Sequence, residues 1–192
     1  MQELKDRIVK EGKVLPGNII KVDGFLNHRI DTELMDHIAE EFGKHFNMDE
    51  VTMILTAEAS GIALSAIVAR HFHKPMIFAK KAKSDNIEGG LYQSDIFSYT
   101  YKKKVTLLVS KEWISADDKI LIIDDFMANG EAMRGLCDIV KAAGATLVGI
   151  GCAVEKGFQG GGDRLRAAGV NLKSLAIIES AEPGNIVFRD ED

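Results

Sequence analysis

Residues 120–132 read ILIIDDFMANGEA, and the interpretation of the whole chain starts from this stretch. The apolar run at its start, rich in β-branched residues, predicts a buried strand, and the helical pattern that begins at Glu131 predicts a helix after a short turn. In sheets built from such units, ligands bind beyond the carboxyl ends of the strands, where loops lead into helix N-termini. Asp124 and Asp125, which close the strand, are therefore candidate functional residues.

Outward from this stretch, short apolar runs alternate with segments of helical periodicity. Strands are predicted at 51–56, 75–81, 119–125, 145–157 and 172–178, and helices at 31–46, 62–72, 131–144 and 163–168. Alternation of this kind is typical of an α/β fold with a mainly parallel central sheet flanked by helices. We expect one domain over residues 1–192, because a chain of this length can bury roughly 70% of its unfolded surface.

One segment interrupts the alternation. Residues 82–90, AKSDNIEGG, are polar and end in two glycines, and we expect a flexible loop over about residues 82–101. Residues 98–101 and 105–109 flank the lysines at 102–104, which predicts an antiparallel pair of strands around a solvated turn.

Composition and charge exclude several classes of protein. Lys and Arg number 24 against 29 Asp and Glu, so the net charge of −5 provides no positive field for nucleic acid. No stretch reaches the ~18 apolar residues of a membrane helix, and we expect a cytoplasmic protein that binds neither membranes nor nucleic acid. Cys137 and Cys152 lie in apolar stretches and are expected to be reduced.

The loop after the two acids has a composition suited to a phosphate group. Backbone amides around Gly130, at the start of the predicted helix, can turn toward an anion. Carboxylates accept hydrogen bonds from sugar hydroxyls, so an acid pair beside such a loop suits a sugar phosphate. Taken alone, an acid pair followed by glycine more often only ends a strand and starts a helix. The candidate phosphate-binding residues are Ala128, Asn129, Gly130, Glu131 and Ala132.

Residues 120–132 as a whole resemble the signature with which the type I phosphoribosyltransferases bind 5-phosphoribosyl 1-pyrophosphate (PRPP). Upstream, TAEASGI at residues 56–62 is similar to the loop that holds pyrophosphate in this family. Residues 82–101 occupy the place of the family's flexible catalytic loop. Nearby lysines could meet pyrophosphate, although we interpret each as a solvated surface charge: Lys80, Lys81 and Lys83.

The resemblance implies a catalytic role for Asp124 and Asp125, which would stabilise an oxocarbenium-like transition state. It also implies a Mg²⁺ ion bound mainly through PRPP and water, for which we name no protein ligand, and it implies a homodimer. Three positions depart from the residues that are frequent in the family signature: Phe126, Asn129 and Ala132.

Two further segments, PGNIIKVDGFLNHRID (16–31) and AVEKGFQGGGDRL (153–165), are similar to the bacterial xanthine phosphoribosyltransferases, a branch of the purine-using members of this family. The resemblance implies a small hood formed by residues 1–30 and the C-terminal segment. It implies that xanthine contacts Ile20, Asn27 and Lys156, with XMP as the product. Asn27 and Lys156 are hydrogen-bond donors, which suits the two carbonyl oxygens of xanthine. Phe158 is a candidate for stacking on the base.

Two alternatives stay open at this stage. A hypoxanthine or guanine phosphoribosyltransferase would bind PRPP in the same way and differ only in its contacts to the base. A regulator that senses PRPP without turning it over would need an output module, and the N-terminal 30 residues are too short for a helix-turn-helix segment. A dinucleotide-binding oxidoreductase would need a GxGxxG motif, which AEASGI does not provide.

Overall fold

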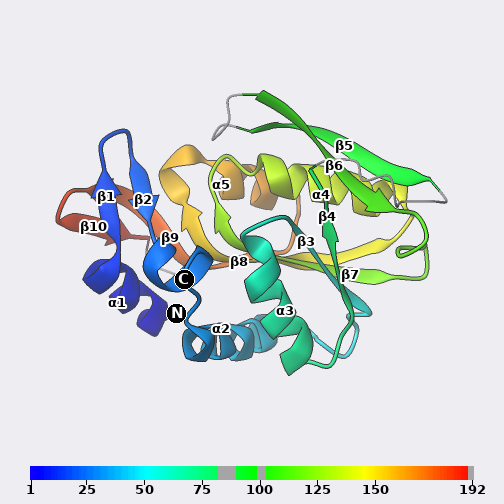
Figure 1. Ribbon diagram of the computed structural model, residues 1–192, viewed down its shortest axis with the longest axis horizontal. Coiled ribbons are helices and arrows are strands. Elements are labelled where there is room, and N and C mark those ends of the chain that lie inside the picture. Colours follow the sequence, from blue (N-terminus) through cyan, green and yellow to red (C-terminus); the bar gives the residue numbers. More distant parts are fainter. Residues whose placement is uncertain (82–89, 99–102, 190–192) are drawn as a thin grey trace.

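The computed structural model describes residues 1–81, 90–98 and 103–189 (Figure 1). The helices are α1 (Gln2–Glu11), α2 (Thr32–His45), α3 (Gly61–His71), α4 (Glu131–Ala142) and α5 (Gly161–Ala167), with short turns η1 (Asp23–Asn27) and η2 (Gly157–Gln159). The strands are β1 (Lys13–Leu15), β2 (Ile19–Lys21), β3 (Met53–Ala57), β4 (Met76–Ala79), β5 (Leu91–Ser98), β6 (Lys103–Ser110), β7 (Lys119–Met127), β8 (Thr146–Lys156), β9 (Leu172–Glu182) and β10 (Asn185–Phe188). None of the helices in these ranges is long and apolar enough to span a membrane.

The central sheet confirms the predicted fold class. Its strands follow the order β10-β9-β8-β7-β3-β4, and all neighbours are parallel except β10, which pairs antiparallel with β9. Strand β7 lies between β8 and β3 and is buried along most of its length. The sheet therefore carries the acid pair at the end of an interior strand, where neighbouring loops surround it.

Alternate residues of β7 enter two separate hydrophobic clusters, because successive side chains of a strand point to opposite faces. Leu121 and Ile123 belong to a cluster that includes buried residues of α1, α2 and α3, whereas Ile120 and Ile122 belong to one formed with α4 and β6. Helices cover both faces of the sheet (Figure 1). Each face of the site strand is thus held by its own core.

The predicted helices form with small shifts at their ends. Asp31 caps α2 as expected, and its side chain accepts a hydrogen bond from the backbone amide of Leu34 at 3.2 Å. Helix α4 ends at Ala142, and Gly144 follows in the left-handed conformation with φ of 73°. Both cysteines are free thiols, and burial raises the pKa of Cys137 to about 11.

The expectation of an irregular loop throughout residues 82–101 is wrong for Leu91–Ser98. These residues form β5, which pairs antiparallel with β6 from Leu91 opposite Ser110 to Ser98 opposite Lys103. The segment did not read as a strand because it is largely polar, but Ser94 and Ile96, two residues apart, are buried where β5 contacts α4. Lys103 and Lys104, assigned to a turn, belong to β6. Residues 82–89 and 99–101 lie outside the described ranges.

The N-terminal elements and β10 gather at one end of the sheet and form the small hood that the fold class predicted (Figure 1). Helix α1 and strand β1 both contact β9. Leu4 and Ile8 of α1 and Phe25 and Leu26 of η1 are fully buried. The hood is therefore anchored on the sheet by apolar contacts, close to the carboxyl ends of its strands.

Candidate active site

The acid pair lies near the carboxyl end of β7, which continues to Met127, and both carboxyl groups are buried. Asp124 is 7% exposed and Asp125 is 1% exposed. The backbone amide of Asp125 donates to Oδ1 of Asp124 at 3.1 Å, and the side-chain amide of Asn27 donates to Oδ2 of Asp125 at 2.9 Å. Oδ1 of Asp125 is buried without a hydrogen-bond partner in the described structure. A buried carboxylate oxygen of this kind is suited to accept a donor from a ligand.

Burial also shifts the proton equilibrium of the pair. Desolvation, together with the charge of the adjacent Asp125, raises the pKa of Asp124 well above its ordinary value, and the charge of Lys81 opposes this shift. The ionised form of Asp124 is therefore costly in the free protein. Hydroxyl donors or positive charge placed beside it would reduce that cost.

The loop that follows the acids turns its backbone into the start of α4. Gly130 has φ of 76°, a conformation that favours glycine, and its carbonyl accepts the first helical hydrogen bond from Arg134 at 2.9 Å. The amides at the start of α4 have no partner within the helix and can point at an anion. The carboxylate of Glu131 is held by the side chain of Arg134 at 3.2 Å and the amide of Phe97 at 3.4 Å.

A second loop, between β3 and α3, meets the acids from the neighbouring strand. A Cβ atom added at Gly61 would lie 2.2 Å from Oγ1 of Thr56 and 2.3 Å from Oδ1 of Asp124, so only glycine fits at the start of α3. Oγ1 of Thr56 is buried without a partner in the described structure. Oγ of Ser65 donates to the carbonyl of Ile123 at 3.0 Å and ties α3 to β7.

These loops enclose a cavity of about 210 Å³. Its lining includes Asp124 and every predicted phosphate-binding residue: Ala128, Asn129, Gly130, Glu131 and Ala132. The structure therefore brings the two sequence motifs into one site. Asp125 does not line this cavity, but it lies beside it through its neighbour Asp124 and its bond to Asn27.

The lining also contains Glu58 and Ser60 of the TAEASGI loop, Lys81, which was named as a possible pyrophosphate contact, and Phe97, which the sequence did not single out. The interpretation of Lys81 as a solvated surface charge is incomplete, because this residue follows β4 and lines the cavity while its amide donates to Oε1 of Glu58 at 2.5 Å. The available signal was position: Lys81 follows a strand that is parallel to β3, and the carboxyl ends of parallel strands share one edge.

The predicted purine-binding residues lie where the hood meets the sheet, outside the lining of this cavity. Ile20 is 7% exposed and packs in the hydrophobic core, and Asn27 bonds Asp125. Nζ of Lys156, at the end of β8, donates to the carbonyl of Asn18 at 3.0 Å and lies 5.5 Å from the ring centre of Phe126. Desolvation lowers the pKa of Lys156.

Comparison with known proteins agrees with this architecture. The chain matches the phosphoribosyl transferase domain over residues 25–168, and it belongs to that family. Over 192 residues it is 51% identical to the xanthine phosphoribosyltransferase of Bifidobacterium adolescentis, covering 98% of this chain and 100% of that protein. It is also 51% identical to the xanthine phosphoribosyltransferase of Lachnoclostridium phytofermentans, with 100% of both chains covered.

Solved structures show the same fold. The adenine phosphoribosyltransferase of Giardia lamblia complexed with 9-deazaadenine matches with a TM-score of 0.76 at 20% identity, covering 93% of this chain and 98% of that one. The enzyme from Rhodothermus marinus matches with a TM-score of 0.74, also at 20% identity, covering 93% and 100%. The resemblance to the phosphoribosyltransferases that the motifs predicted is confirmed.

Proposed function

We propose that this protein transfers the 5-phosphoribosyl group of PRPP to N9 of xanthine, giving XMP and pyrophosphate. The observation that carries the proposal is the convergence of Asp124 with both loops in one cavity, with Asp125 beside it, in a chain about half identical to xanthine phosphoribosyltransferases over its full length. The same resemblance supports a homodimer in the cytoplasm, which light scattering and cell fractionation would test.

The PRPP molecule would lie across the two loops. Backbone amides of residues 128–132 receive its terminal phosphate at the start of α4, and residues 57–60 with Lys81 face its pyrophosphate. Asp124 and Asp125 accept hydrogen bonds from the ribose hydroxyls, which reduces the free-energy cost of burying ionised carboxylates there. The separation of acidic and amide-lined regions orients the sugar between them.

The residues present fit a magnesium ion that arrives with PRPP. Oδ1 of Asp125 is a buried carboxylate oxygen without a partner in the described structure, and hard oxygen atoms of this kind suit Mg²⁺ or its bound water. When bound, the ion would neutralise charge on the pyrophosphate leaving group. Most of its ligands would be PRPP oxygens and water.

In the reaction the bond between C1 of the ribose and the pyrophosphate oxygen breaks, and its electron pair leaves with pyrophosphate. Positive charge develops on the sugar ring, where the buried carboxylates of Asp124 and Asp125 stabilise it in a low-dielectric site. The lone pair of N9 then forms the new bond to C1, and a proton leaves the imidazole ring of the base. The protein supplies position and charge and needs no nucleophilic side chain.

The base would bind between the hood and the end of β8. Asn27 and Lys156 donate hydrogen bonds to the carbonyl oxygens of xanthine, while Ile20 contributes apolar contact and Phe158 stacks on the ring. The partly desolvated ammonium of Lys156 supports this role, because a charge away from bulk water favours a base with anionic character.

The test is to incubate the purified protein with PRPP, Mg²⁺ and xanthine, guanine or hypoxanthine, and to separate the nucleotides by chromatography. We expect XMP with the highest kcat/KM. A higher kcat/KM with guanine or hypoxanthine would show that this purine, and not xanthine, is the preferred substrate. If none of the three purines gives a nucleotide, the proposed activity is refuted. Asp125→Asn, which keeps the shape of the side chain, serves as the inactive control.

A further inference from the structure

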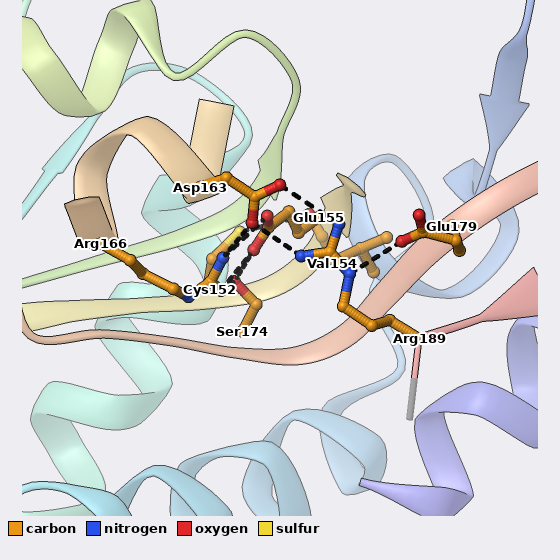
Figure 2. Close-up of polar contacts among 8 residues, drawn as sticks. All are labelled: Cys152, Val154, Glu155, Asp163, Arg166, Ser174, Glu179 and Arg189. Carbon is orange, nitrogen blue, oxygen red and sulfur yellow. Dashed lines mark hydrogen bonds and ion pairs between the residues drawn. The ribbon is translucent and has the colours of Figure 1, made fainter. Parts of the chain in front are cut away.

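A network of charged side chains outside the cavity centres on Glu155, a residue of β8 that the proposed reaction does not use (Figure 2). Glu155 is completely buried. Arg166 of α5 bonds both of its oxygens, Nη1 to Oε1 at 3.1 Å and Nη2 to Oε2 at 2.7 Å, and Oγ of Ser174 donates to Oε2 at 2.5 Å. A bidentate pair of this kind fixes orientation as well as distance. Helix α5 is therefore fastened to the central sheet.

Two adjacent glycines let α5 contact both the network and the phosphate loop. A Cβ atom added at Gly162 would lie 2.0 Å from Oε1 of Glu155. One added at Gly161 would lie 2.4 Å from the carbonyl oxygen of Ala128 and 2.7 Å from the amide nitrogen of Gly130. The first turn of α5 thus lies directly between the buried carboxylate and the backbone of the loop.

Arg164, an exposed residue of α5, adds a direct bond to the loop. Its Nη2 donates to the carbonyl oxygen of Asn129 at 3.0 Å. On the outer side of the helix, Asp163 receives Arg189 at 2.7 Å, and the same guanidinium bonds Glu179 of β9 at 2.7 Å (Figure 2). The helix is held by the sheet on one side and holds the loop on the other.

We propose that α5 is a brace that fixes the phosphate loop for PRPP, with Arg164 and Glu155 as positioning residues that themselves contact no substrate. The inference rests on the proposed function, because it assigns the terminal phosphate of PRPP to residues 128–132. Amides bind phosphate only when they point at it, and a misplacement of about 1 Å in an active site can cost up to ~100-fold in rate. Of the residues assigned to the base, Ile20 and Asn27 lie in β2 and η1 of the hood, whereas Phe158 lies in η2, which contacts α5 and whose Gln159 carbonyl accepts a bond from Arg164 at 3.4 Å.

The first test compares Arg164→Ala and Arg164→Lys with Arg70→Ala, the same change at an exposed position near the end of α3. Loss of a charged donor to one carbonyl is expected to raise KM for PRPP roughly tenfold in Arg164→Ala. Arg164→Lys keeps a donor and should recover part of this loss. KM for xanthine should change less than KM for PRPP in the Arg164 variants, and the melting temperature should stay within error of the wild type in all three variants.

The second test, Gly161→Ala, pushes the loop backbone directly and should raise KM for PRPP by more than Arg164→Ala does. Thermal unfolding checks that the variant is folded. An unchanged KM for PRPP in both Gly161→Ala and Arg164→Ala would overturn the brace. So would an equal rise in KM for PRPP and for xanthine, because that pattern indicates a general structural effect.

Failure of the proposed function is separable from failure of the brace. If the wild type forms no nucleotide, calorimetric titration with PRPP and Mg²⁺ replaces KM in the same comparison. Weaker PRPP binding by Arg164→Ala and Gly161→Ala would then support the brace without the reaction. Absence of PRPP binding by the wild type would overturn both.

Discussion

Asp124 and Asp125 are neighbours in sequence but have different surroundings. Asp125 receives the side-chain amide of Asn27, whereas Oδ1 of Asp124 receives the backbone amide of the next residue. The sequence identified both acids, because two carboxylates at the end of an apolar run are visible as a pattern. The bond to Asn27, 98 residues away, is not visible, because it depends on how the hood folds onto the sheet.

The raised pKa of Asp124 predicts that this residue trades stability for function. Asp124→Asn keeps the oxygen that accepts from the Asp125 amide and removes a buried charge. We therefore expect a higher free energy of unfolding and a loss of turnover. The melting temperature of Asp124→Asn should lie above that of the wild type. Calorimetry and the nucleotide assay check the two halves of the prediction.

The pH dependence of this gain has a defined sign. Because the folded pKa of Asp124 lies above its ordinary value of 3.8, the stability associated with its protonated form is present below that pH. It is lost as the pH rises through the folded pKa. The advantage of Asp124→Asn over the wild type should therefore be absent below pH 3.8 and grow toward neutrality. A constant difference across this range would contradict the shift.

Gly61 gives the sharpest steric prediction at the residue scale. In Gly61→Ala the new methyl group would meet both Thr56 and Asp124 at less than van der Waals distance, so α3 or the acid must move. We expect kcat/KM for PRPP to fall roughly 100-fold. Gly24→Ala is the matched control, because nothing lies within 4 Å of its added Cβ atom. If Gly61→Ala matches both Gly24→Ala and the wild type in steady-state kinetics, the site tolerates the shift.

At the scale of elements, long periodic segments were predictable and short or polar ones were not. Strands β3, β7 and β8 carry continuous apolar runs, and α2 to α4 carry clear helical periodicity. Helix α1 escaped notice because only Leu4 and Ile8 of its ten residues are buried. The polar strand β5 is defined by the fit of Ile96 against Gly135, where an added Cβ atom would lie 2.5 Å from the isoleucine. Such a contact exists only after tertiary packing.

The start of α2 carries an element-scale prediction. Asp31 caps the helix and also pairs with Arg7 of α1. The hydrogen bond from the Leu34 amide is the largest cause that lowers the pKa of its carboxyl group, and the bond from Arg7 is the second. Asp31→Ala should reduce the free energy of unfolding by about 1–2 kcal/mol at pH 7. Asp31→Asn keeps a capping oxygen and should lose less.

The same lowered pKa fixes the direction of the pH effect. Stability from the Asp31 carboxylate is present above pH 3.8 and is lost as the pH falls through the lower folded pKa. Urea unfolding of the wild type and Asp31→Ala should therefore give curves that converge in strong acid. A difference that stays constant from neutral pH to strong acid would assign the loss to packing instead of charge.

At the scale of the whole molecule, two hydrogen bonds join the hood to the sheet at the proposed substrate sites. Asn27 bonds Asp125, and Lys156 bonds the backbone of Asn18. The resemblance to the phosphoribosyltransferases implied that hood and sheet would meet around a ligand. It did not predict that Asn27, proposed to bind the base, would contact Asp125, proposed to be catalytic, because the turn η1 that presents Asn27 has no sequence signature.

This contact predicts coupling between the two substrates. If PRPP binds Oδ1 of Asp125 as proposed, it contacts the same carboxylate that Asn27 bonds through Oδ2, so its binding should change the affinity for xanthine, and the effect must be reciprocal. Calorimetric titration with xanthine, with and without a carbocyclic PRPP analogue that cannot react, measures the ratio of the two Kd values. We expect a ratio of about fivefold or more in the wild type.

In Asn27→Ala both Kd values should rise while their ratio approaches one. His28→Ala, an exposed neighbour in the hood, should keep the wild-type ratio. An unchanged ratio in Asn27→Ala would show that the substrates communicate by another route, and a ratio of one in the wild type would show that the hood and the sheet bind them independently.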